Sequence, residues 1–491
     1  MGIDIDTVEF STDDFTAFGA ALEANLEALK RVLVQPGFGV GPPSLGAELE
    51  MYIVDAAGDP LYANEDILTD AIDPQLTLEL NRYNLEYNLS PCLMSDSPFV
   101  HSECEILEKL QSLRAVAALH GGRIVPIGIL PTLTRADFGS HCITDKKRYH
   151  ALVSQLIKRR GGEFKIDING EMPLKMKMED ITLEGANTSF QVHYRVAPEN
   201  YADTFNAIQL MTPLALAIGA NSPTLFGHSL WHETRIPLFK QSIDTRQRHR
   251  YSAKEPARVN FGHGWVRRGP LELFTEAVRL YPPLLPVCFD QNKEQGGGRA
   301  PALAELRLHQ STVWLWNRPV YDDADGGHLR IEMRALPAGP TAIDMVANAA
   351  FLIGLAEGIR PHIDELLASL PFSLAEYNFY RAAQAGLDAQ LVWPTVGQTR
   401  CKEQAAHSII QQLLPCAEAG LARLGIGAEE GKRYLSVIED RLHRAQTGSV
   451  WQQKRLRQLT DKLPLDKALH AMLEDFMVNS ESNLPVAQWA L

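Results

Sequence analysis

The chain has 491 residues, of which 45% are hydrophobic and 22% are charged, and it carries a net charge of −13 at pH 7. This composition predicts a folded protein with a large core. The negative charge argues against binding to nucleic acid or to an anionic membrane, both of which need clustered Lys and Arg, so we expect small-molecule substrates.

The sequence lacks the usual marks of export or membrane insertion. Its six cysteines form no CxxC pair, and its first residues, Met-Gly-Ile-Asp-Ile-Asp, do not resemble a signal peptide. No run supplies the roughly 18 apolar residues that we expect of a membrane span. These features predict free thiols, a reducing compartment and a cytoplasmic location.

The first predicted element is an amphipathic helix. Apolar residues recur at steps of three or four over residues 15 to 33, and Ser11 or Thr12 is the expected cap. The helix should end near Pro36. From Leu45 to Ala335, short strand patterns alternate with turns and moderate helices, which predicts an α+β arrangement.

Beyond Pro340 the pattern becomes almost wholly helical. Helices are expected at residues 342–359, 361–370, around 377–391, 405–424 and 429–446. No linker of Pro, Gly and Ser separates the two parts. We therefore predict three regions: a lead-in with the first helix at 1–45, a catalytic sheet domain at 46–340, and a helical C-terminal part at 341–491 packed on it.

The strand patterns place acidic groups opposite apolar faces. In the segment from Leu45 to Val54 the apolar side chains have a period of two, so Glu48 and Glu50 share the other face. The same period isolates polar side chains in three further segments: Glu86 in the second, Gln191, His193 and Arg195 in the third, and Arg330, Glu332 and Arg334 in the fourth. If these strands share one sheet, four carboxylates and a histidine converge.

Four carboxylates this close together would repel one another unless cations neutralise them. An oxygen-rich set with one imidazole and no thiolate suits Mg²⁺ or Mn²⁺ better than zinc, and such ions often bridge carboxylates to phosphates. The alternative is that these glutamates lie on the solvated face of an antiparallel sheet. For His193 the alternative is a core or surface histidine satisfied by a neighbouring backbone group.

Arginines near such a site have two readings as well. Arg330 and Arg334 either neutralise Glu332 across the sheet or stabilise charge during phosphoryl transfer. Arg235 and Arg318 are further candidates for the second task, although surface ion pairs explain them equally well.

Two glycine-rich runs carry less information. Residues 37–41 lack the spacing of a dinucleotide fingerprint, and no P-loop motif occurs, so ATP would have to bind without one. Residues 296–299, Gly-Gly-Gly-Arg, predict a mobile turn, with a lid over phosphates as the alternative.

The sequence also resembles the type-2 glutamate-cysteine ligases and the related carboxylate-amine ligases of the glutamine synthetase superfamily. The family's GxExE signature is similar to residues 46–50, and its second metal-binding segment is similar to residues 84–91, with Glu79 as an accessory. Its histidine strand matches 188–194, its substrate and nucleotide segment resembles 221–223 with Arg235, and its last metal strand resembles 330–334. Residues 378–389 and 447–452 resemble its helical tail.

The resemblance implies an α+β fold of glutamine synthetase type, in which a curved antiparallel β-sheet funnel is flanked by helices. ATP would enter from one side and an acid from the other, with Mg²⁺ or Mn²⁺ between them. The implied metal ligands are Glu48, Glu50, Glu86, His193 and Glu332. Arg334 and Arg235 would serve catalysis, and together with Arg318 they would hold the nucleotide phosphate.

The implied activity is ATP-dependent C–N ligation in two steps. A carboxylate, first of all the γ-carboxylate of glutamate, attacks the γ-phosphorus of ATP, and an amine such as cysteine then displaces phosphate from the acyl phosphate. This would place the enzyme in glutathione biosynthesis. A ligase for another acid or amine, including ammonia, and a non-catalytic nucleotide sensor remain alternatives, and a homodimer is compatible with the helical tail.

Overall fold

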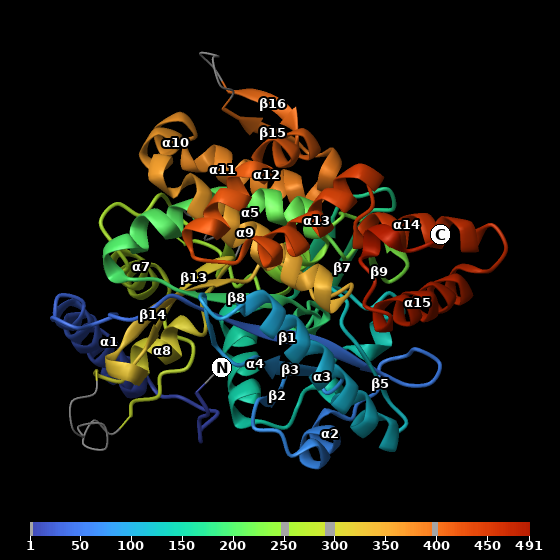
Figure 1. Ribbon diagram of the computed structural model, residues 1–491. Helices are drawn as coiled ribbons and strands as arrows, with labels where there is room; N and C mark the ends of the chain where they lie inside the picture. Colours follow the sequence, from blue (N-terminus) through green and yellow to red (C-terminus); the bar gives the residue numbers. More distant parts are fainter. Residues whose placement is uncertain (1–2, 247–254, 290–299, 395–400) are drawn as a thin grey trace.

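The computed structural model describes residues 3–246, 255–289, 300–394 and 401–491 (Figure 1). The predicted glycine turn at 296–299 lies outside these residues.

A large antiparallel sheet forms the centre of the fold. Its strands lie in the order β13-β14-β8-β1-β3-β2, and β4 and β5 pair with the two ends of the long strand β1. Their bounds are β1 Ser44–Val54, β2 Leu76–Leu78, β3 Asn84–Asn88, β4 Cys92–Leu93, β5 Arg123–Val125, β8 Phe190–Arg195, β13 Asn317–Asp322 and β14 His328–Met333. Every pair within this sheet is antiparallel, as predicted.

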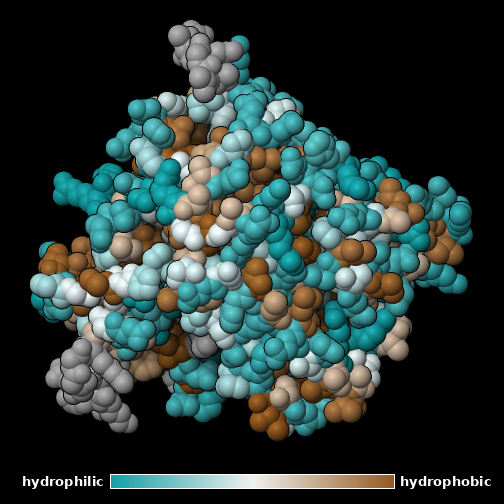
Figure 2. All heavy atoms as spheres, viewed as in Figure 1, coloured by the Kyte–Doolittle hydropathy of each residue, from teal (hydrophilic) through white to brown (hydrophobic). Residues whose placement is uncertain are grey.

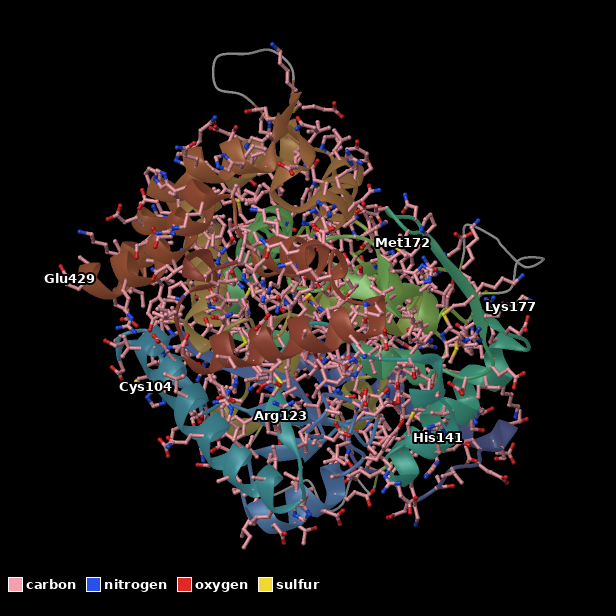
Figure 3. All side chains as sticks on the ribbon, turned by 90° about the vertical axis from the view of Figure 1, so that its right-hand side faces the viewer. Cys104, Arg123, His141, Met172, Lys177 and Glu429 are labelled. Carbon is pink, nitrogen blue, oxygen red and sulfur yellow. The ribbon has the colours of Figure 1, made fainter. Side chains whose placement is uncertain are left out.

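The other strands of the described chain form two-stranded pairs. They are β6 Phe164–Ile168 with β7 Leu174–Met178, β9 Thr224–Leu225 with β10 His228–Ser229, β11 Val259–Asn260 with β12 Trp314–Leu315, and β15 Gln390–Trp393 with β16 Lys402–Ala405. The β6–β7 hairpin lies at the edge of the molecule, where Met172 and Lys177 project outward (Figure 3).

The helices surround this sheet and make up most of the C-terminal part. They are α1 Thr12–Val32, α2 Asn64–Ala71, α3 Pro98–Leu119, α4 Lys147–Arg160, α5 Tyr201–Gly219, α6 Arg235–Ser242, α7 Leu271–Leu280, α8 Ala304–Gln310, α9 Ala342–Ile359, α10 Ile363–Ser369, α11 Phe372–Ala385, α12 Ala406–Arg423, α13 Ala428–Arg444, α14 Gly448–Thr460 and α15 Leu465–Glu481. The α+β fold with a helical C-terminal part is thus confirmed. Ser11 caps α1 through a capping box with Asp14, also as predicted.

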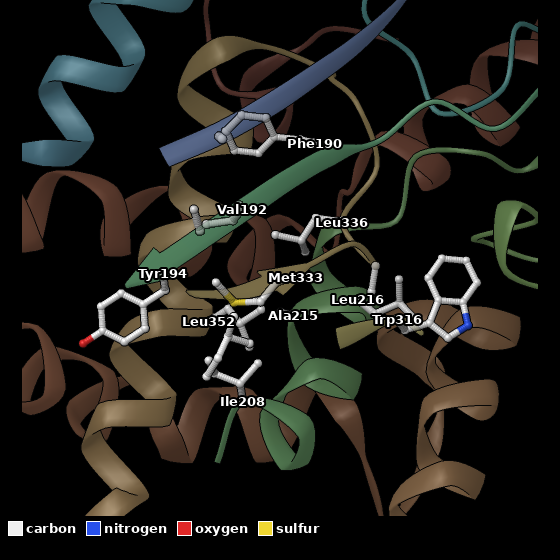
Figure 4. Close-up of a cluster of buried hydrophobic side chains, with 14 of the residues drawn as sticks. Phe190, Val192, Tyr194, Ile208, Ala215, Leu216, Trp316, Met333, Leu336 and Leu352 are labelled. Carbon is white, nitrogen blue, oxygen red and sulfur yellow. The ribbon is translucent and has the colours of Figure 1, made fainter. Parts of the chain in front are cut away.

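One face of the sheet is apolar and is covered by helices. Val192 on β8 and Met333 on β14 pack with Ala215 on α5 and Leu352 on α9 (Figure 4). Both helices are buried on nearly all sides and are mostly apolar, as expected for helices in a core, and α9 also packs on α12. This arrangement leaves the opposite face of the sheet free for polar side chains.

A continuous cluster of buried apolar residues extends from Ile5 to Leu442, so it crosses all three predicted regions. The boundaries 1–45, 46–340 and 341–491 stay predictions. The face in Figure 2 is mostly hydrophilic, with apolar residues in small scattered groups.

Two details of the sequence analysis need correction. The helix expected around 377–391 ends at Ala385, and the hairpin β15–β16 interrupts the helical tail because Leu391 and Trp393 alternate inward as strand residues. The expectation that no segment is long and apolar enough to span a membrane is also wrong. The segment 342–369 passes that test, but 94% of its most apolar window is buried inside the fold, as in the core helix of a soluble protein.

Candidate active site

Strand register brings the predicted polar side chains onto one face of the sheet. Arg318 on β13 lies opposite Glu332 on β14, and Glu332 lies opposite His193 on β8. On the other side of β8, Gln191 pairs with Glu48 of β1. Glu50 of β1 then pairs with Glu86 of β3, which pairs with Thr77 of β2. Because directly opposite residues share a face, these residues form one polar row across six strands.

The first acidic group in this row consists of Glu48, His193 and Glu332. Their ligand atoms lie within 4.8 Å of one another, and all three side chains are buried. His193 Nε2 lies 3.2 Å from Glu48 Oε1, yet it is a buried nitrogen without a hydrogen-bond partner among the described residues. An imidazole nitrogen left this way between two carboxylates suits a metal ligand.

The second group consists of Glu50, Glu79 and Glu86, whose carboxylate oxygens also lie within 4.8 Å of one another. Burial and, after it, the neighbouring Glu86 carboxylate together raise the pKa of Glu50 to about 8. Burial raises the pKa of Glu86 as well, with Glu48 adding to the effect, and the pKa of Glu79 is raised well above its ordinary value by burial and by Glu86. A divalent cation here would relieve this repulsion.

Two arginines neutralise Glu332 in this structure. Arg318 donates from Nε to Glu332 Oε2 at 2.7 Å and from Nη2 to Oε1 at 2.9 Å. Arg334 donates from Nη1 to Glu332 and to Gln191. Burial alone would raise the pKa of Glu332, but these two guanidinium groups hold it below its ordinary value. The contacts of Arg334 thus agree with the interpretation that it neutralises Glu332. Stabilisation of phosphate charge by Arg334 stays a prediction.

Arg235 lies apart from this row. Its side chain is 2% exposed, pairs with Glu233 at 2.8 Å, and donates from Nη2 to the carbonyl of Ala335 at 2.7 Å. It lines neither of the cavities described below. These contacts do not support direct phosphate binding by Arg235. They fix the backbone next to Arg334.

Two adjoining cavities open onto the polar row. The larger, about 470 Å³, is lined by the Glu48–His193–Glu332 group and by Arg195, Arg307 and Arg330. The smaller, about 340 Å³, is lined by the Glu50–Glu79–Glu86 group and by Arg334. Glu48, Ser311 and Arg318 line both. A reaction centred on the row therefore has two approaches, one to each acidic group.

The sequence analysis missed several residues of the smaller cavity. Glu184, in the short 3-10 helix Thr182–Ala186, lines it, and burial raises its pKa to about 7. Arg148 and Tyr149 reach it from α4. No periodic pattern surrounds Glu184, so nothing in the sequence could have singled it out. Glu79, named only as an accessory, completes the second acidic group.

Comparison with known proteins found one matching family model. Residues 44–252 match the family model described as Glutamate-cysteine ligase family 2 (GCS2). None of the curated protein sequences matches the chain.

Solved structures resemble this fold over most of its length. A glutamate-cysteine ligase from Francisella tularensis in complex with AMP is 13% identical, with a TM-score of 0.54, over 91% of this chain and 90% of that chain. A bifunctional glutathione synthetase from Pasteurella multocida is 11% identical, with a TM-score of 0.46, over 94% of this chain and 55% of that one. At such low identity the first likeness shows a shared fold only. The family match over residues 44–252 confirms the resemblance to glutamate-cysteine ligase family 2 that the strand motifs predict.

Proposed function

We propose that this protein is an ATP-dependent carboxylate-amine ligase that joins the γ-carboxylate of glutamate to the amine of cysteine or a related amine. The observation that carries the proposal is the polar row. It holds two acidic groups, of whose six members only Glu79 is partly exposed, has two arginines close to Glu332, and opens into two adjoining cavities. The family match over residues 44–252 supports the same class of enzyme.

The donor sets of the two groups fit Mg²⁺ or Mn²⁺. Each has three ligand atoms within 4.8 Å, five of the six are carboxylate oxygens, and the sixth is a nitrogen of His193. The proposed ligands are Glu48, His193 and Glu332 in one group and Glu50, Glu79 and Glu86 in the other. When bound, such ions neutralise phosphate oxygens and orient them for in-line transfer.

The residues of this chain would act by positioning and by charge. Gln191 donates to Glu50 and accepts from Arg334, so it fixes both side chains on the wall of the smaller cavity. Arg318 lines both cavities and Arg334 lines the smaller one, and there they would meet the γ-phosphate as it moves from ATP to the acid. Arg235 takes a positioning role, because it holds the Ala335 carbonyl directly after Arg334.

The reaction needs no nucleophile from the protein. A carboxylate oxygen of the acid attacks the γ-phosphorus, ADP leaves, and the amine nitrogen displaces phosphate from the acyl phosphate with loss of a proton. The proposed product with cysteine places the enzyme in glutathione biosynthesis and in the cytoplasm. The polar row does not distinguish cysteine from ammonia or other amines, since acceptor pockets are built from loops.

The proposal is tested by phosphate release from Mg-ATP with glutamate, alone and with a panel of amines that includes cysteine and ammonia. We expect release that requires glutamate and increases with one amine. Release with a different acid would keep the ligase and change its substrate. Tight ATP binding without release for any pair would favour the alternative of a nucleotide sensor.

A further inference from the structure

A pair of arginines lies on the same sheet face as the polar row, one step further along two strands. Arg195 of β8 is the register partner of Arg330 of β14. Arg195 lies two residues after His193 on β8, and Arg330 lies two residues before Glu332 on β14. The arginine pair therefore lies about 7 Å along the strands from the pair His193 and Glu332. Both arginines line the larger cavity.

The positive charge of this pair is only partly compensated. Like charges directly opposite on neighbouring strands are destabilising. Arg330 pairs with Asp322 at 2.8 Å, whereas Arg195 has no ion pair within the described ranges. Its guanidinium donates only to the carbonyl of Val40, at 3.3 Å, and the Nε atoms of both arginines are buried without a hydrogen-bond partner. Buried donors left unpaired in this way cost free energy that an anion would recover.

The glycine-rich run at 37–41 helps to hold Arg195. Gly41 has a φ of +153°, and a Cβ atom there would lie 2.6 Å from Arg195 Nη2. A side chain at Gly41 would be strained by this backbone conformation and would move the guanidinium away from the turn. With glycine there, the guanidinium lies against the turn, and its Nη2 donates to the Val40 carbonyl.

We propose that Arg195 and Arg330 form a subsite for the nucleotide phosphates that precede the γ-phosphate. This rests on the proposed use of ATP. A polyphosphate chain can reach from the Glu48–His193–Glu332 group to the arginine pair, because both lie on one cavity wall. The same cavity has apolar lining suited to a nucleoside, from Leu89, Pro91, Phe274, Pro319, Val320 and Tyr321. The smaller cavity carries the Glu50–Glu79–Glu86 group and Glu184, and it is assigned to the acid and the amine.

The test compares binding of ADP with Mg²⁺ and binding of adenosine by calorimetry. The variants are Arg195→Gln and Arg330→Gln, with Arg195→Lys to retain the charge. The matched control is Arg457→Gln, which removes one arginine charge from α14, where the side chain is 67% exposed. We expect ADP binding to weaken at least tenfold in both glutamine variants, while adenosine binding stays within twofold. The lysine variant should recover part of the loss, and the control should match the wild type.

Circular dichroism and thermal melting establish that each variant is folded. ADP affinity within twofold of the wild type in a folded Arg195→Gln would overturn the subsite. If that variant also had a raised KM for the acid, the two arginines would bind the substrate carboxylate in place of the nucleotide phosphates, which would likewise overturn the subsite. If the wild type binds no ADP, both proposals fail. If it binds ADP through these arginines but forms no product, only the proposed function fails.

Discussion

The crowded second acidic group predicts an unusual effect of removing a charge. Glu50→Gln should make the metal-free protein less stable at pH 4 and more stable at pH 9. The folded state holds the proton of Glu50 up to a pKa of about 8, whereas the unfolded chain releases it near 4.5. The stability contributed by the protonated form is therefore complete below pH 4.5 and is lost as the pH rises toward 8.

The size of the effect follows from these two values. The gap between 4.5 and 8 corresponds to about 5 kcal/mol of stability lost by the wild type between pH 4.5 and pH 9. The glutamine cannot ionise, so it escapes this loss. The substitution also lowers the free energy of unfolding by about 1 kcal/mol at every pH. Both oxygens of Glu50 accept hydrogen bonds, from the Ser189 backbone nitrogen and from Gln191 Nε2, so the amide nitrogen of the glutamine would face one of these donors. The variant should thus be about 1 kcal/mol less stable at pH 4, nearly as stable as the wild type at pH 5, and about 4 kcal/mol more stable at pH 9.

Urea unfolding of both proteins in the presence of a chelator, from pH 4 to pH 9, measures this difference. In a parallel series, saturating Mg²⁺ should stabilise the wild type at pH 8 by about 3 kcal/mol at 100 times its Kd, and the variant by less. A stability difference that is the same at pH 4 and pH 9 would refute the argument, because Glu50 would then titrate normally.

Three further predictions concern other positions. Arg235→Met should cost about 3–5 kcal/mol in urea unfolding by leaving the buried Glu233 unpaired, and a stable variant without turnover would instead place Arg235 in the reaction. Gly420→Ala should cost about 1–3 kcal/mol because its Cβ would meet the Gly354 carbonyl of α9, whereas the control Gly427→Ala has nothing within 4 Å and should be neutral. Glu332→Gln should keep its circular dichroism spectrum and lose metal-dependent turnover by on the order of 100-fold, and wild-type activity would remove Glu332 from the site.

Much of the candidate site could be predicted from the two-residue alternation of apolar side chains along the strands. The alternation of apolar residues predicted that Glu48, Glu86, His193 and Glu332 each lie on the polar face of their strand. In the structure, the antiparallel register places these four side chains near one another. Register itself could not be read from the sequence, so the opposition of Arg318 and Glu332 was not predicted.

Residues outside regular strands were the ones that sequence analysis missed or misplaced. Glu79 follows a three-residue strand, and Glu184 lies in a short 3-10 helix, where no period marks a face. Arg235 resembled a family arginine, and the sequence did not show that it forms a buried ion pair with Glu233, two residues before it. The hairpin β15–β16 appeared helical because four-residue strands are too short to outweigh their helical neighbours.

The central claim is that the acid is activated by phosphoryl transfer from ATP. The most direct measurement uses glutamate labelled with ¹⁸O in both γ-carboxylate oxygens, turned over with ATP and the active amine, followed by mass spectrometry of the products. Attack on the γ-phosphorus predicts one labelled oxygen in each released phosphate, with ADP as the second product. Unlabelled phosphate, or label in AMP with release of pyrophosphate, would contradict the account.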